Sequence, residues 1–252
     1  MHDDLNVPAT HPLRTLWDQH HARQRYPRGV IAVPEPIPGL GFFPGGYGLF
    51  AAKKGQRLPK LPEGGVMVLG HDFHSEEGYK RSLRDGAEPD SSPTWRNLLD
   101  LLRKAGIKES DCFFTNLYMG LRKGSKTTGT FPGAGDEEFV AYCQGFLLDQ
   151  IRMQRPRLII TLGIHVPPLI GALSKDLSSW TEKRGIKHLD KVGALKAPVR
   201  FDAIDGFGTT VVALLHPSLR HASLRHRSYK GAGNGDPELA LLRDARDAAL
   251  RD

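Results

Sequence analysis

Three groups of polar residues carry side chains that can take part in acid–base and hydrogen-bonding chemistry: Gly70-His71-Asp72, Asn116, and His216-Pro217-Ser218. A carboxylate can orient water and stabilise a developing cation, an amide offers one acceptor and two donors, and an imidazole can donate to a developing anion. Each residue type also has a structural use. Aspartate and asparagine often satisfy turns, and a histidine after an apolar strand can be a buried, hydrogen-bonded group. The elements that position these side chains therefore decide between the two interpretations.

Short apolar runs lead into each polar group. Residues 66–69 end at Gly70, residues 112–116 end in Asn116, and residues 209–215 run into His216. Residues 158–162 form another run of the same kind. Continuous apolar runs of this length are typical of strands buried on both faces. Residues 199–204 can pair with 209–215 as a hairpin.

Helix signals separate these strands. Ser92 and Pro93 can begin a helix that stops at Gly106, Asp136 can cap a second helix, and a third follows Gly163. Strands that alternate with helices predict an α/β fold, here a three-layer α/β/α sandwich with a central, mostly parallel four-stranded sheet. Catalytic groups of such sheets sit at the carboxyl ends of the strands. We therefore expect the three polar groups to meet in one reaction centre.

The organisation along the chain indicates a single domain over residues 1–252. Residues 1–64 are rich in proline and predict an irregular N-terminal wrap with one short helix near Leu13–Arg25. Residues 65–230 form the core, in which Ser174–Pro198 is interpreted as a surface connection. A C-terminal helix is expected over residues 236–251.

The polar groups and their setting resemble the uracil-DNA glycosylase superfamily. In that family a strand ends in a Gly-x-Asp or related turn, a later strand ends in Asn, and the last core strand runs into His-Pro-Ser. Gly70-His71-Asp72, Asn116 and His216-Pro217-Ser218 occur here in the same order, over residues 66–227. The resemblance implies a monofunctional DNA glycosylase that flips a base out of DNA. Such an enzyme hydrolyses the N-glycosidic bond of uracil, or of another damaged or modified base, in base excision repair.

The resemblance also implies the catalytic roles. Asp72 would position or activate the water that attacks C1′ of the deoxyribose, and His216 would donate to the base O2 as negative charge collects on the departing ring. A preorganised donor of this kind contributes about 3 to 4 kcal/mol to lowering a barrier. Asn116 would read the O4 and N3–H edge of the flipped base.

Base recognition would also involve the neighbours of Asp72. Gly70 and His71 would lie beside the base, and Phe73 would form part of the pocket wall. The best-known branch has proline and then tyrosine after the aspartate, where Phe73 and His74 stand here. The aromatic residue that stacks on the base is left open; the candidates are Phe73, Tyr79, Phe42 and Phe43.

The formal net charge of +7 favours a polyanionic partner, because basic residues gather in two segments. A solvated loop is the alternative for each segment. In the family, the loop after His-Pro-Ser enters the DNA and fills the space of the extruded nucleotide, and Leu219 and Arg220 occupy that place here. Backbone amides at the start of a helix near His165 can also attract phosphate. The predicted DNA contacts are Ser218, Leu219, Arg220, Arg225, Arg122, Lys123 and His165.

Other classes of site receive less support. The apolar stretches are too short to cross a bilayer, and the N-terminal residues lack the basic start and apolar run of a secretory signal, so we expect a cytoplasmic protein. We also expect a monomer. Two cysteines are too few for a four-cysteine iron–sulfur or zinc site. His71 and His74 lack a clear further ligand, so no metal and no cofactor are expected.

Two alternatives to a glycosylase remain open. The first is a related DNA-binding protein with little or no catalytic activity, suggested by the altered residues around Phe73. The second is a nucleotide- or nucleoside-processing enzyme built on the same kind of sheet. Binding to duplex DNA should weaken steeply with ionic strength, whereas binding of a small substrate should show much less dependence.

Overall fold

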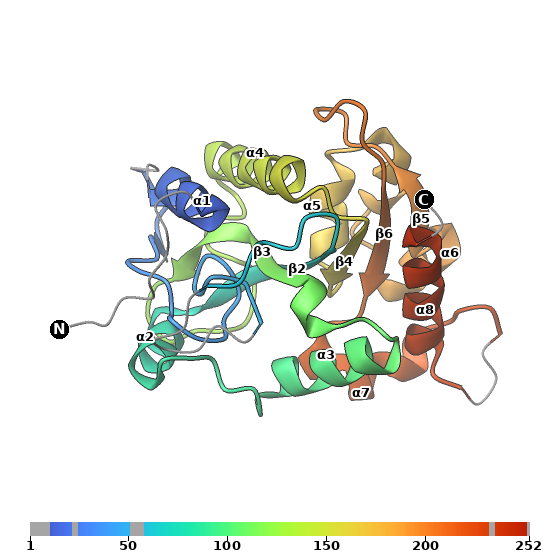
Figure 1. Cartoon of the computed structure of the whole chain (residues 1–252), viewed down its shortest axis with the longest axis horizontal. Helices are drawn as coiled ribbons and strands as arrows, with labels where there is room; N and C mark the ends of the chain where they lie inside the picture. The colour runs from blue at the N-terminus through green and yellow to red at the C-terminus, as the bar shows by residue number, and fades with distance from the viewer. Residues whose placement is uncertain (1–10, 22–24, 51–57, 232–234, 251–252) are drawn as a thin grey trace. The chain divides into compact units, whose positions relative to one another are not determined.

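A computed structural model of the chain describes residues 11–21, 25–50, 58–231 and 235–250. Its strands are β1 (Val30–Ile31), β2 (Val66–Ser75), β3 (Cys112–Arg122), β4 (Leu158–Leu162), β5 (Leu195–Val199) and β6 (Thr209–Leu214). Its α-helices are α1 (Pro12–His21), α2 (Glu76–Asp85), α3 (Pro93–Lys104), α4 (Glu137–Gln154), α5 (Val166–Gly171), α6 (Ile186–Val192), α7 (Arg220–Ser223) and α8 (Pro237–Ala249) (Figure 1). Short 3₁₀ helices are η1 (Glu109–Asp111), η2 (Lys175–Trp180), η3 (Pro217–Leu219) and η4 (Leu224–His226).

Hydrogen bonds join the described strands into one sheet with the order β1-β3-β2-β4-β6-β5. β2 and β4 pair in parallel, as do β4 and β6, whereas β1 and β5 pair antiparallel with β3 and β6. The predicted α/β class with a mostly parallel sheet is confirmed. The predicted number of four strands is wrong, because β1 and β5 add antiparallel strands at the edges and make six.

The chain forms two compact units, each assembled from three segments. The first unit contains Met1–Pro62, Gly70–Asp90 and Phe113–Met153. The second contains Glu63–Leu69, Ser91–Cys112 and Gln154–Asp252. The boundary falls inside β2, directly before Gly70. The single domain expected over the whole chain stays a prediction.

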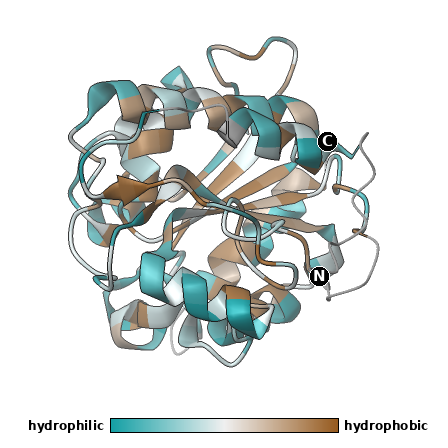
Figure 2. Cartoon of the chain, turned by 90° about the vertical axis from the view of Figure 1, so that its left-hand side faces the viewer, coloured by the Kyte–Doolittle hydropathy of each residue, from teal (hydrophilic) through white to brown (hydrophobic). Residues whose placement is uncertain are grey.

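Buried apolar side chains and a helix cap account for the strands and helices of the second unit. β4 and β6 are buried along their whole length, and α8 packs against both of them and against β5 (Figure 1). Colouring by hydropathy shows how strongly apolar residues are concentrated in the strands (Figure 2). Helix α3 begins as predicted, with Pro93 in its first turn and the Ser92 hydroxyl accepting from the amide of Trp95 at 3.4 Å. Its apolar stripe, which includes Leu98 and Leu102, is fully buried.

The helix predicted after Asp136 is confirmed in the first unit, where the Asp136 carboxylate accepts from the amide of Phe139 at 2.8 Å. In the N-terminal wrap, α1 ends at His21, and residues 22–24 of the longer helix predicted there lie outside the described residues. The last residue of the predicted C-terminal helix, Arg251, also lies outside them. Within the described ranges, no helix has the length and apolar character needed to span a bilayer.

The strands that carry the polar groups are longer than predicted. β2 continues to Ser75 and β3 to Arg122, so Asp72 and Asn116 lie within strands and not at strand ends. Gly70 ends the apolar run but not the strand. A glycine stands there because the Asn116 side chain approaches the backbone closely, and not because the chain turns. A Cβ built on Gly70 would lie 2.3 Å from the Asn116 Oδ1 atom.

The segment Ser174–Pro198 is not a surface connection. It contains η2, α6 and most of β5, and it buries Leu177, Trp180 and Leu189. The predicted hairpin with β6 exists, but its first strand lies at Leu195–Val199 and not at residues 199–204. The buried apolar residues of this segment are separated by polar residues, so the sequence shows no continuous apolar run there.

Candidate active site

In the first unit, Asp72 is held by two basic side chains. The guanidinium of Arg122 donates from Nε to Oδ2 at 2.7 Å and from an Nη atom to Oδ1 at 3.1 Å. The Nδ1 atom of His71 lies 2.6 Å from Oδ1. The Arg122 and Asp72 side chains are only 6% and 13% exposed, so this bidentate ion pair is largely buried. Both carboxylate oxygens are therefore engaged within the protein.

Arg122 also organises the loop that follows β3. It donates to the backbone carbonyl oxygens of Gly129 and Thr130 at 3.0 and 3.1 Å, and its guanidinium carbon lies 5.4 Å from the centre of the Phe131 ring. Phe131 in turn stacks on Tyr118 with 4.4 Å between ring centres. The N–H donors of Arg122 thus form hydrogen bonds within the first unit. We therefore withdraw it from the predicted DNA contacts.

Electrostatics favour an ionised Asp72. Burial by itself would raise the pKa of this carboxyl group, but the hydrogen bonds from His71 and Arg122, with their charges, outweigh burial and lower the pKa. Nearby, burial raises the pKa of Tyr118 to about 12, with smaller contributions from Cys143 and Asp72. At neutral pH the site thus contains a carboxylate beside a neutral phenol.

Asn116 lies against Gly70 on the neighbouring strand. The asparagine is buried, at 4% exposed, and its Nδ2 atom lies 3.5 Å from the carbonyl oxygen of Phe43, which also accepts from the Asn116 backbone amide at 3.0 Å. A Cβ on Gly70 would lie 3.7 Å from the Phe42 ring. Gly70, Asn116 and Phe42 therefore lie together in the first unit.

The four aromatic candidates for stacking occupy different surroundings. The Phe73 ring fills the space over Gly45, whose Cβ would lie 2.2 Å from it, and its centre is 6.0 Å from that of Tyr79. The Tyr79 hydroxyl donates to the carbonyl oxygen of Glu35. Phe43 stacks on Phe146 at 6.1 Å. All four rings are buried within the protein; Phe42 meets Phe114 edge-on at 5.6 Å, and a Cβ on Gly70 would lie 3.7 Å from the Phe42 ring.

In the second unit, His216 begins the tight turn that follows β6. Its Nδ1 atom accepts from the Ser218 backbone amide at 3.3 Å and lies 2.8 Å from the Ser218 hydroxyl. An Nδ1 that accepts from an amide leaves the hydrogen of a neutral imidazole on Nε2. Gly163, at φ +81°, approaches within 3.3 Å of the His216 Cβ if a Cβ is built on it, and its amide donates to Leu214 at 2.9 Å. The turn is thus fixed in a form in which His216 can donate from Nε2.

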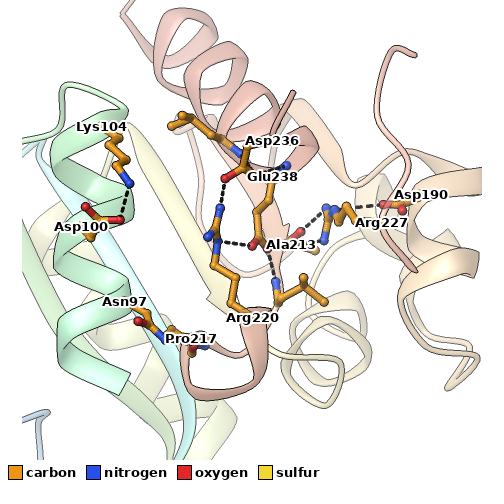
Figure 3. A network of polar contacts seen from close by, with 12 residues as sticks. Asn97, Asp100, Lys104, Asp190, Ala213, Pro217, Arg220, Arg227, Asp236 and Glu238 are labelled. Carbon is orange, nitrogen blue, oxygen red and sulfur yellow. Dashed lines mark hydrogen bonds and ion pairs between the residues drawn. The ribbon is translucent and has the colours of Figure 1, made fainter. Parts of the chain in front are cut away.

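A buried polar network supports this turn from behind (Figure 3). The Asn97 side chain on α3 donates to the carbonyl oxygen of Pro217 at 2.9 Å, and Glu238 on α8 accepts from the amide of Leu215. Glu238 is fully buried. Its burial raises its pKa, against the favourable effects of the Leu215 amide and of Arg227 and Arg220.

Arg220 belongs to this network and not to a DNA-binding surface. It is buried and pairs with Asp236 and Glu238, with 2.9 Å between its Nε atom and Glu238 Oε2. Arg227 is also buried, and it donates to the carbonyl oxygen of Ala213 at 2.6 Å. Since a buried guanidinium committed to two carboxylates is not available to phosphates, the prediction that Arg220 contacts DNA is corrected.

The other predicted DNA contacts are at the surface. Lys123 is exposed in the first unit, and the second unit exposes His165, Ser218, Leu219 and Arg225. Leu219 is 60% exposed, which is high for a large apolar side chain. These positions are compatible with the predicted contacts, whereas Arg122 and Arg220 are not.

Asp72 and Asn116 lie in the first unit and His216 in the second. The proximity of Asn116 to the Gly70-His71-Asp72 segment accords with the sequence argument, and a reaction centre common to all three residues stays a prediction. Sequence reasoning missed the supporting side chains of Asn97 and Glu238. The isolated polar Asn97 within an apolar helical stripe was a usable signal for the first; Glu238 resembled an ordinary residue of a helix start.

In the part of the chain that the structure describes, no cluster of three or more His, Cys, Asp or Glu side chains is arranged to hold a metal ion. A comparison with curated proteins found no match. A family model, described as the uracil DNA glycosylase superfamily, matches residues 66–232. This match covers most of the chain and includes Asp72, Asn116 and His216. The chain belongs to the uracil DNA glycosylase superfamily.

Proposed function

We propose that this protein is a monofunctional DNA glycosylase that hydrolyses the N-glycosidic bond of uracil, or of another damaged or modified base, after flipping the nucleotide out of DNA. The observation that carries the proposal is the contact between Asn116 and Gly70, two residues before the ionised Asp72. It brings the Asn116 amide and the Asp72 carboxylate to the same pair of neighbouring strands. The membership of the superfamily supplies the reaction class.

Asn116 recognises the base in this proposal. Its buried amide can accept from N3–H and donate to O4 of uracil, whereas cytosine presents the opposite pattern. Phe42 provides the face on which the base stacks, because its ring is the candidate that borders Gly70, at 3.7 Å from a Cβ built there. Base–aromatic stacking is worth about 1 to 3 kcal/mol for each base.

Asp72 and His216 carry the chemistry. The Asp72 carboxylate serves the attack of water on C1′ and the stabilisation of the cationic sugar. His216 donates from Nε2 to the base O2, which the acceptor role of its Nδ1 atom supports. A neutral imidazole suffices for this donation.

The DNA-binding surface consists of the exposed predicted residues. Leu219 would enter the stack and fill the space of the extruded nucleotide, since an apolar wedge offsets part of the few kcal/mol that flipping costs. Lys123 and Arg225 would contact phosphates, and Ser218 and His165 would lie alongside the backbone.

Excision from a panel of duplexes tests the proposal. Oligonucleotides that contain uracil, hypoxanthine, xanthine or an oxidised pyrimidine are incubated with the protein, and abasic sites are detected by cleavage in alkali. We expect excision of at least one base, and a loss of at least about tenfold in single-turnover rate for both Asp72→Asn and His216→Ala. Circular dichroism and thermal melting establish that each variant is folded. Wild-type rates in both folded variants contradict the proposal.

One observation favours a second candidate, a DNA-binding relative with little catalytic activity. The Arg122 guanidinium pairs with both oxygens of the Asp72 carboxylate, and a carboxylate paired with a cation stabilises a sugar cation less well. This candidate predicts tight, salt-sensitive binding to duplex DNA without cleavage in alkali for any base of the panel. Strand scission with a single substrate eliminates it.

A further inference from the structure

The contacts of Asp72 fix the hydrogen positions around it. Both of its oxygens accept from the guanidinium of Arg122, at 2.7 and 3.1 Å, so the carboxyl group is ionised and has no hydrogen to donate. The hydrogen in the 2.6 Å contact with His71 must then lie on the histidine Nδ1. A neutral His71 therefore carries its lone pair on Nε2, on the opposite side of the ring.

The imidazole of His71 is held in one orientation. Its ring lies almost perpendicular to those of Tyr118 and Phe131, with centres 5.0 and 6.5 Å apart. The side chain is 20% exposed, so part of the ring reaches the surface while Nδ1 stays on Asp72. A base, a carboxylate that orients it and a fixed tautomer form the arrangement by which many hydrolases activate a nucleophile.

Asp72 itself is poorly suited to take a proton from water. Its two oxygens already accept hydrogen bonds from Arg122 and His71, and these bonds lower its pKa. A less basic carboxylate is a weaker general base near neutral pH, whereas an imidazole is well matched to that pH.

We propose that His71 is the catalytic base that accepts the proton of the attacking water, while Asp72 orients the imidazole and Arg122 keeps Asp72 ionised. This inference rests on the proposed glycosylase function. The water oxygen forms a bond to C1′ as the bond from C1′ to the base nitrogen breaks, and the bonding electron pair leaves with the base. One water proton passes to Nε2 of His71, which makes the ring an imidazolium beside the Asp72 carboxylate. His71 later releases this proton to solvent, the base anion takes one up, and the products are the free base and an abasic sugar.

Charged and titratable groups lie beside His71 on two strands. Asp72 neighbours it on β2 and in turn pairs with Arg122, and the Tyr118 ring faces it from β3. The carboxylate stabilises the imidazolium that forms during the reaction.

The test is His71→Asn, in which the amide can donate to Asp72 in place of Nδ1 but has no basic nitrogen. General base catalysis typically contributes 10²- to 10⁴-fold, so we expect the single-turnover excision rate to fall by about 10²-fold or more. The dissociation constant for the substrate duplex should change by less than about threefold. Added imidazole should restore part of the rate of His71→Ala. The matched control is His74→Asn, since His74 is an exposed histidine of the same strand, and it should retain the wild-type rate.

The outcomes separate this inference from the proposed function. Excision by the wild type, together with a near wild-type rate in folded His71→Asn, overturns the role of His71 and leaves the glycosylase proposal standing. Failure of the wild type to excise any base of the panel overturns both. If His71→Asn does not fold, the absence of imidazole rescue in a folded His71→Ala overturns the role of His71.

Discussion

Replacing Arg122 by leucine should destabilise the protein strongly, because it leaves the carboxylate of Asp72 buried without its cation. The two side chains are 6% and 13% exposed, and two hydrogen bonds of 2.7 and 3.1 Å join them. Removing one partner of a buried ion pair typically costs about 3 to 5 kcal/mol. For a chain of this size, that corresponds to a fall in Tm of about 6 to 20 °C. Urea unfolding followed by tryptophan fluorescence and scanning calorimetry would measure both quantities.

Acid should reduce the difference between Arg122→Leu and the wild type. Protonation of Asp72 neutralises the unpaired charge in the variant, so the loss of stability should be smaller at about pH 3.5 than at pH 7. Arg122→Lys keeps the charge without the bidentate contact and should be intermediate. The control is Lys123→Leu, an exposed neighbour that should change stability by less than about 0.5 kcal/mol. A loss below about 1 kcal/mol in Arg122→Leu, or one independent of pH, would refute the reasoning.

Three further predictions test other parts of the site. In Gly70→Ala, the new Cβ would lie 2.3 Å from Asn116 Oδ1 and must displace that amide, so single-turnover excision should fall at least about tenfold; an unchanged rate contradicts this contact. Leu219→Ala should leave urea stability unchanged within about 0.5 kcal/mol but slow excision from fully paired duplex more than from single strands, and equal slowing argues against a wedge. The lowered pKa of Asp72 means that its share of stability is present above the carboxyl's unfolded pKa, about 3.9, and is lost as the pH falls through the lower folded value. Acid unfolding below about pH 4 should therefore be steeper for the wild type than for Asp72→Asn, and parallel curves would exclude this contribution.

Much of the fold was predictable because its signals are local. The apolar run at Val66–Leu69 and the caps at Ser92 and Asp136 each act within a few residues, and the structure confirms all three elements. The ends of β2 and β3 were misplaced because Gly70 and Asn116 resemble strand terminators. These two residues occur there because they contact each other, although they are 46 positions apart in the sequence. Local sequence patterns do not contain such a contact.

The same limit applies to the charged residues of the site. Arg122 and Arg220 look like surface cations in a basic protein, and nothing near Arg122 in sequence reveals that its carboxylate partner lies 50 positions earlier. Arg220 pairs with Asp236 and Glu238, which sequence reasoning interpreted as an ordinary helix start. Residue types at Asp72, Asn116 and His216 could be linked to a chemistry from the sequence, but the groups that set their charge and tautomer could be found only in three dimensions.

The buried Glu238 has a consequence for where this protein can be shortened. The family segment ends at residue 232, six positions before it. A chain cut at that point would keep every residue of the family segment but would leave the Leu215 amide without its acceptor, Arg220 without either of its carboxylate partners, and Arg227 with Asp190 alone of its described carboxylate partners. The C-terminal helix is therefore an obligatory part of the fold, and the smallest fragment that keeps the histidine turn in shape extends past the family's own limit to the end of α8.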